Sequence, residues 1–231
     1  LDYTSTDVLL APGSLSTNSD GVYTADVALK TPNFSGVVET PSSERIRYGG
    51  FQIRNLDTDF NDWGNVNRDG AFAENLEQPE SGTTTYEIKV DPPYEGVEPL
   101  SRTTFYVEID DTGGVTVFDD TETTEVVSET ITVQGSDIQG YKLVLNEANV
   151  TGTVVEETET DGATSNVSNS WVESRTAQGQ YLWEKSTNSK FDGSFAMDLE
   201  DGSYELIANA PWNSSKVRSA ACEITVASGS V

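Results

Sequence analysis

The sequence of 231 residues contains no histidine, one cysteine and one methionine. Histidine is the usual acid–base residue and the commonest metal ligand at neutral pH, so its absence removes most familiar catalytic constellations. A single cysteine excludes an intrachain disulfide and a thiolate zinc site. Carboxylate pairs of the kind used in glycoside hydrolysis stay open, although no motif marks two of them. We therefore expect a protein that is not an enzyme and needs no cofactor.

Basic residues are also scarce, with 13 Lys and Arg against 39 Asp and Glu, which gives a net charge of −26. Such a surface repels phosphate backbones and anionic lipids, so we expect no nucleic-acid partner. No apolar run approaches the roughly 18 residues of a membrane span, so we expect no membrane insertion. The first residues have neither a basic start nor an apolar core, so we expect any secretion signal to lie outside this sequence.

An internal repeat organises the chain. Asn33-Phe34-Ser35-Gly36-Val37-Val38 matches Asn149-Val150-Thr151-Gly152-Thr153-Val154, an offset of 149 − 33 = 116. The same offset links Val27-Ala28-Leu29 to Leu143-Val144-Leu145. In the middle of the period the offset drifts, as expected for length changes in loops. We therefore expect two domains, a first repeat over 1–114 and a second over 115–231, and we interpret the chain as a window of a longer array.

Apolar residues alternate with polar ones along several short segments, which is the period of a half-buried strand. One example is Phe105, Val107 and Ile109, whose counterparts Cys222, Ile224 and Val226 lie one residue beyond the offset. This shift predicts a bulge or changed turn, and it places Cys222 as a small buried residue. Asp-Gly pairs separate the strands and favour hairpins. The fold class is therefore all-β, as two tandem Greek-key β-sandwiches of prealbumin-like or Ig-like type.

The second repeat carries three motifs in order: Gly152-Thr153-Val154, Asp192-Gly193-Ser194-Phe195 and Asp201-Gly202-Ser203-Tyr204. In this order they resemble carboxypeptidase regulatory-like modules, which are transthyretin-like sandwiches similar to the CnaB-like repeats of bacterial or archaeal surface proteins. The resemblance covers 149–226 well and 33–109 less well. It implies non-catalytic sandwiches strung in tandem on secreted or wall-attached proteins. The opening strands lack the lysine that forms an isopeptide bond in many CnaB-type domains, so we expect no such crosslink.

One acidic loop is a candidate calcium site, because Ca²⁺ prefers six to eight oxygen ligands. Its oxygen-bearing side chains alternate as in the first half of a calcium loop, at Asp57, Asp59, Asn61 and Asp62. The expected glycine and the downstream acid are missing, and the second repeat has no such loop. A solvated acidic turn is therefore the favoured interpretation, with calcium as the alternative.

Four N-x-S/T sequons are candidate glycosylation sites, at Asn33, Asn149, Asn166 and Asn213. Asn33 and Asn149 are equivalent in the repeat, so a structural role at a strand entry is the competing interpretation. Aromatic residues at equivalent positions of the two repeats could either pack in the core or form an exposed platform on which sugars stack. For Trp171 we predict a core position, and for Trp63 and Trp183 both readings stay open.

Together these features predict an extracellular structural protein, secreted or at the cell surface. It would form an array, stalk or filament whose partners are neighbouring copies of itself or adjacent repeats. The alternative is a non-catalytic binding or adhesion module for carbohydrate or a host protein. The open strand edges of a sandwich must be protected or used for assembly, which links the predicted fold to the first hypothesis.

Overall fold

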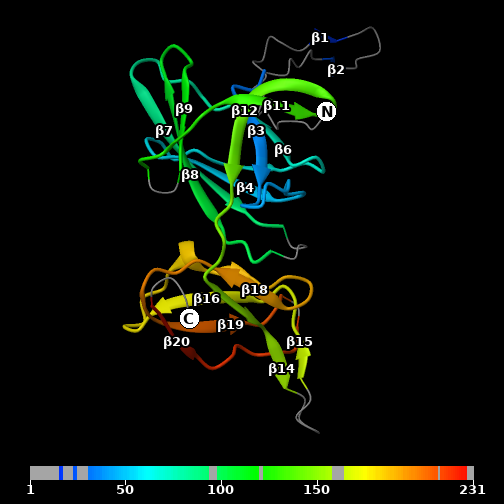
Figure 1. Ribbon diagram of the computed structural model, residues 1–231, viewed down its shortest axis with the longest axis vertical. Coiled ribbons are helices and arrows are strands. Elements are labelled where there is room, and N and C mark those ends of the chain that lie inside the picture. Colours follow the sequence, from blue (N-terminus) through cyan, green and yellow to red (C-terminus); the bar gives the residue numbers. More distant parts are fainter. Residues whose placement is uncertain are drawn as a thin grey trace.

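The computed structural model describes residues 16–17, 23–24, 31–93, 98–119, 122–157, 164–212 and 214–227. Within these ranges the protein is all-β, and its one helical element is a single 3₁₀ turn, η1 (Trp183–Lys185). No helix in this part of the chain has the length and apolar character needed to cross a bilayer. The strands form two sandwiches joined end to end (Figure 1).

The first sandwich packs a six-stranded sheet against a four-stranded sheet. The larger sheet has the order β10-β9-β8-β7-β4-β5, formed by Glu125–Val126, Val115–Phe118, Thr103–Asp110, Thr83–Asp91, Gly50–Asn55 and Asn61–Asn65. The smaller sheet has the order β11-β12-β3-β6, formed by Glu129–Val133, Ser136–Val144, Phe34–Glu39 and Ala71–Glu74. Two further strands, β1 (Ser16–Thr17) and β2 (Tyr23–Thr24), make a separate two-stranded sheet.

Alternation along the strands builds the core of this sandwich. On β8, Phe105, Val107 and Ile109 point inward and are at most 2% exposed. They join one cluster with Phe34 of β3 and Leu143 of β12, so both sheets contribute to the same core. Burying each such side chain contributes roughly 1.5–3 kcal/mol relative to leaving it in water.

The domain boundary predicted at 114/115 differs from the boundary that the strand pairing shows. Strands β9 to β12 span 115–144, and all of them pair within the first sandwich. In particular, β12 runs parallel to β3, with Tyr141 opposite Gly36 and Val144 opposite Glu39. The sequence repeat has a period but no natural starting point, so the offset alone could not show which sheet these strands join. The chain passes to the second sandwich at 146–149.

The second sandwich is smaller. One sheet has the order β17-β16-β19-β20, formed by Thr187–Asn188, Trp171–Thr176, Gly202–Asn209 and Cys222–Val226. Opposite it lie β13 (Val150–Thr153) and β18 (Ser194–Met197), and β14 (Val155–Glu157) pairs with β15 (Thr164–Asn166) just beyond. Its core contains Val150, Val172, Met197, Leu199, Leu206 and Val226.

The repeat is visible in individual hydrogen bonds. Asn33 Nδ2 donates to the carbonyl of Leu76 at 2.8 Å, and its Oδ1 accepts from Leu76 N at 2.9 Å. Asn149 makes the same two bonds with Leu199, at 2.7 and 3.0 Å. Each pair of bonds, termed here an asparagine clamp, ties the entry of the first strand to the segment that follows the hairpin.

The one-residue shift predicted for the last strand is confirmed by the register. Tyr86 on β7 lies opposite Val107, and its equivalent Tyr204 on β19 lies opposite Ile224, an offset of 224 − 107 = 117. The two tyrosines also match in their own contacts, because Tyr86 donates to Glu77 O and Tyr204 to Glu200 O, both at 2.9 Å.

Candidate functional site

The junction between the two sandwiches contains a buried lysine. Lys89 lies on the outer face of β7 and is only 5% exposed. Its ammonium group forms an ion pair with Glu87 of the same strand at 3.0 Å and a second with Glu184 of the other sandwich. A buried ammonium needs such partners, because desolvation of an unpaired charge is costly. Lys89 therefore couples the two sandwiches through Glu184.

The connecting segment 146–148 is bonded to the first sandwich along its length. Ser101 N donates to Asn146 O at 3.0 Å, and Ala148 N donates to Pro99 O at 2.7 Å. Between them, Leu100 and Glu147 form an isolated antiparallel bridge. The connection is therefore a short paired segment rather than a free linker.

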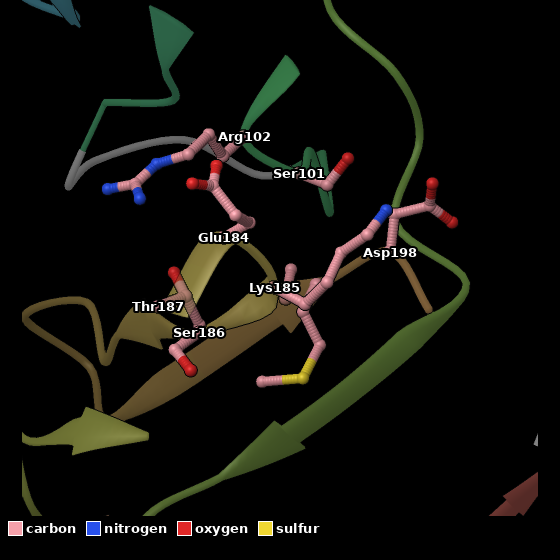
Figure 2. A pocket seen from close by; sticks show the side chains of 9 residues that line it. Ser101, Arg102, Glu184, Lys185, Ser186, Thr187 and Asp198 are labelled. Atoms are coloured by element: carbon pink, nitrogen blue, oxygen red, sulfur yellow. The ribbon is translucent and has the colours of Figure 1, made fainter. Parts of the chain in front are cut away.

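A small crevice lies where the sandwiches meet. It is lined by Ser101 and Arg102 of the first sandwich and by Glu184, Lys185 and Ser186 of the second (Figure 2). Arg102 is held in place by Asp91, with Nε 2.5 Å from Oδ1. The crevice has room for little more than a water molecule, so it is a contact between units and not a ligand pocket.

Three aromatic side chains gather on the outer face of the second sandwich. The rings of Trp171 and Trp183 lie 4.9 Å apart at 35°, and Tyr181 meets Trp183 edge-on at 6.2 Å. Trp171 Nε1 donates to the hydroxyl of Tyr181 at 2.9 Å, and the guanidinium of Arg175 lies 5.9 Å from the centre of the Tyr181 ring. Trp183 remains 53% exposed. We call Trp171, Tyr181 and Trp183 the aromatic cluster.

The core position predicted for Trp171 is therefore wrong. Its neighbour Val172 is buried at 2% exposure and takes the place that Phe51 has in the first sandwich. Because successive strand residues point to opposite faces, a one-residue misalignment is enough to reverse the assignment. Trp63, on β5, is 62% exposed and is therefore not a core residue.

A charged group lies beside the aromatic cluster on the same sheet face. The carboxylate of Glu173 accepts hydrogen bonds from Arg175 at 2.8 Å, Arg218 at 2.7 Å and Asn209 at 2.9 Å. Burial alone raises the pKa of Glu173, but these hydrogen bonds and the two guanidinium charges outweigh it and lower the pKa. Glu173 is thus an ionised group that orders the two arginines.

The four residues of the candidate calcium loop are not gathered around one point. The Oδ2 atom of Asp57 accepts from the hydroxyl of Thr84 at 2.8 Å, and Oδ1 of Asp62 accepts from Trp63 N at 2.8 Å. Asn61 lies on β5, and Asp59 is exposed in the preceding turn. Across the described residues, no three His, Cys, Asp or Glu side chains are placed to hold a metal. Calcium at Asp57, Asp59, Asn61 and Asp62 thus gains no support from the geometry.

The sequons differ in how their amide nitrogens are used. The Nδ2 atoms of Asn33 and Asn149 donate within the asparagine clamps, which gives both residues the structural role considered above. Asn166 is exposed and donates to Asp192 O at 2.7 Å. Asn213 lies outside the described residues. Glycosylation of the four remains a prediction.

One carboxyl group has a strongly altered acidity. Glu74, at the end of β6, has its pKa raised from 4.5 to about 7, first by burial and second by the negative charge of Asp62. Glu74 does not repeat in the second sandwich, where Met197 takes its place opposite Val150. The raised pKa alone assigns Glu74 no chemical role.

The sequence did not single out Lys89, Glu184 or the partnership of Tyr181 with Trp171. Lys89 stands on the polar side of a normal strand alternation, so nothing local distinguishes it from a solvated lysine. The aromatic cluster left a clearer signal, because Tyr181-Leu182-Trp183 is rich in aromatics and Trp183 aligns with Trp63.

No family model matches the sequence, and no similar curated protein was found. Among solved structures, the C-terminal fragment of the pilus adhesin SpaC from Lactobacillus rhamnosus GG is 12% identical, over 84% of this chain and 82% of that chain, with a TM-score of 0.29. A streptococcal ancillary pilin is 13% identical, over 84% of this chain and 58% of that chain, with a TM-score of 0.25. Both TM-scores are below 0.5, so neither likeness assigns a family or a function.

Proposed function

We propose that the protein is an extracellular structural repeat protein of a cell-surface array, stalk or filament, and that it acts through contacts between units rather than by catalysis. The observation that carries this proposal is the junction. Its connecting segment is paired with the first sandwich at Leu100, and Lys89 bridges to Glu184. Two units joined in this way transmit orientation from one to the next.

The composition supports the same function. The net charge of −26 keeps the sandwiches soluble and mutually repelling, which suits a protein exposed to the medium. The tandem repeat and the resemblance to carboxypeptidase regulatory-like and CnaB-like modules also favour a secreted or surface location. The absence of histidine from the whole sequence accords with a structural function.

The first test measures whether the junction is rigid. In ¹⁵N relaxation experiments on the full chain, we expect both sandwiches to report one correlation time. Glu184→Lys places a second ammonium against Lys89, and the two correlation times should then diverge. Glu223→Lys is the matched control, because Glu223 is exposed on β20, at the sheet edge opposite β17. Independent tumbling of the wild-type sandwiches would contradict the proposal.

The second test locates the protein. Immunogold electron microscopy of intact cells with an antibody against the folded chain should label the cell surface in a regular or linear pattern. Labelling confined to the cytoplasm would refute the surface function regardless of how rigid the junction is.

A second candidate function rests on the aromatic cluster. Exposed indole rings flanked by ordered polar groups such as Glu173 and Arg175 suit the alternating apolar and hydroxyl faces of a carbohydrate. A glycan array probed with the full chain tests this, with Trp183→Ala as the variant and Trp212→Ala as the control. Trp212 is 93% exposed and is not one of the rings that stack in the cluster. Binding that survives Trp183→Ala would exclude the cluster as the site.

A further inference from the structure

The two sandwiches differ at one strand edge. In the first, β3 is paired on both sides, with β6 on one edge and β12 on the other. In the second, the equivalent strand β13 pairs with β18 on the side that corresponds to β6. Within the described residues no strand pairs with its other edge.

The open edge leaves the second core less covered. In the first sandwich, Leu143 and Leu145 from β12 and its end are fully buried against the core. Repeat-equivalent core positions are buried in the first sandwich but half-buried or exposed in the second, and these pairs are Val38 and Val154, Phe72 and Phe195, Tyr86 and Tyr204, and Phe105 and Cys222. The prediction that Cys222 is buried is thus wrong for a single copy of the chain.

The unpaired backbone groups on β13 can be identified from the first sandwich. Leu145 N donates to Glu39 O, whereas Val38 N donates to Gly70 O on the opposite side. Alternate residues of a strand present their N–H and C=O groups to opposite edges. The residues facing the free edge of β13 are therefore Thr151 and Thr153, and both are exposed.

A glycine on β13 also leaves room for a neighbouring strand to pass close by. A Cβ added to Gly36 would lie 2.8 Å from Tyr141 N, so β12 can pass there only because residue 36 is glycine. The second sandwich has Gly152 at this position. The three atoms nearest to a Cβ on Gly152 all belong to Phe195, which lies on the partner strand β18.

The chain contains a second segment at the repeat position of β12. The offset of 116 places Val27 and Leu29 at the positions of Leu143 and Leu145. It also places β2 (23 + 116 = 139) within β12 and β1 (16 + 116 = 132) within β11. Both pairs are antiparallel, but their registers differ, because Ser16 lies opposite Thr24 whereas Thr132 lies opposite Asp137. The first sandwich already has its own β12, and β1 and β2 belong to neither sandwich.

We propose that residues 13–30 of one copy of the chain add to the free edge of β13 in a second copy. The segment would run parallel to β13, and its Val27 and Leu29 would enter the second core as Leu143 and Leu145 enter the first. This inference deepens the proposed structural function by naming the partner and the contact. Main-chain bonding to a sheet edge provides affinity, and the alternate side chains provide the register.

The geometry of such a contact favours a linear polymer. Donor and acceptor are different surfaces, so the contact is heterologous and propagates head to tail. In Figure 1 the β1–β2 pair lies at the end of the molecule away from the second sandwich. Because each copy carries a charge of −26, assembly should be stronger at high salt.

The main test compares two full-length variants by mass photometry and negative-stain microscopy. Val27→Asp combined with Leu29→Asp places charges at the two core positions and should abolish oligomers. Ala28→Asp is the matched control, because its equivalent Val144 is 43% exposed, and it should leave assembly within about twofold of wild type. Filaments formed by the double variant would overturn the proposal.

A peptide experiment identifies the occupant. A labelled peptide of residues 20–32 should bind the double variant saturably at one site per chain, and the same peptide with Val27→Asp should bind at least tenfold more weakly. Thr153→Pro, which removes an N–H from the free edge, should abolish peptide binding while circular dichroism shows the fold retained. Absence of binding by the wild-type peptide would refute strand donation. A chain that labels the cell surface and has a rigid junction would still support the structural function in that case.

Discussion

Leu143→Ala tests whether β12 stabilises the first sandwich, as the sheets show, or the second, as the repeat period suggested. Leu143 is fully buried and packs in the same cluster as Phe34 and Phe105. Leucine to alanine changes at such sites cost about 2–5 kcal/mol, and we expect about 3 kcal/mol because the strand is pinned on both sides. Val144→Ala on the same strand, at a side chain 43% exposed, should cost less than about 1 kcal/mol.

Hydrogen exchange measured by mass spectrometry assigns that loss to a sandwich. The most protected amides exchange through global opening of their own unit, so a loss of about 3 kcal/mol accelerates them roughly a hundredfold. We expect this acceleration in β4 and β7 and no change in β16 and β19. The reasoning fails if exchange increases mainly in the second sandwich, or if the two variants behave alike.

Two further outcomes follow from single residues. The raised pKa of Glu74, about 7 in the folded protein against 4.5, means that the unfolded chain loses this proton first and stability falls as pH rises from about 4.5 to 7. Glu74→Gln should therefore match wild type in urea unfolding at pH 4 and be more stable at pH 8 by about 1–2 kcal/mol, allowing for solvent at the partly exposed carboxyl; an equal difference at both pH values would contradict this. Asn149→Ala removes an asparagine clamp and should cost the second sandwich about 1–3 kcal/mol, and Asn149→Asp should cost at least as much, because it places a carboxylate oxygen where the amide nitrogen donates to Leu199 O. Peptide mapping of the native protein will show whether Asn149 also carries a sugar.

The sequence predicted the parts of the fold that depend on local pattern. Alternation identified the strand at Phe105, and the repeat offset paired Asn33 with Asn149 and found the one-residue shift before Ile224. Each of these signals can be read from short segments of the sequence. Their confirmation shows that strand identity was specified locally.

The features that the sequence missed depend on contacts between distant segments. The pairing of β12 with β3 joins segments about a hundred residues apart, and nothing in β12 itself names its partner. The same holds for Lys89 and Glu184. The prediction of a core position for Trp171 failed for a different reason. A shift of one residue exchanges the two faces of a strand, and Val172 was equally compatible with the core.

The parallel pairing of β3 with β12 also determines how the first sandwich responds to tension. The chain enters this unit at the start of β3 and leaves it at the end of β12, and the two strands lie side by side from Gly36 and Tyr141 to Glu39 and Val144. A pull along the chain therefore draws the two strands past each other lengthwise and loads all of the hydrogen bonds between them at once. Strands pulled apart from one end would release those bonds one after another. The fold is consequently arranged as a mechanical clamp, and stretching single molecules should extend the first sandwich only at a force well above that needed to peel a hairpin.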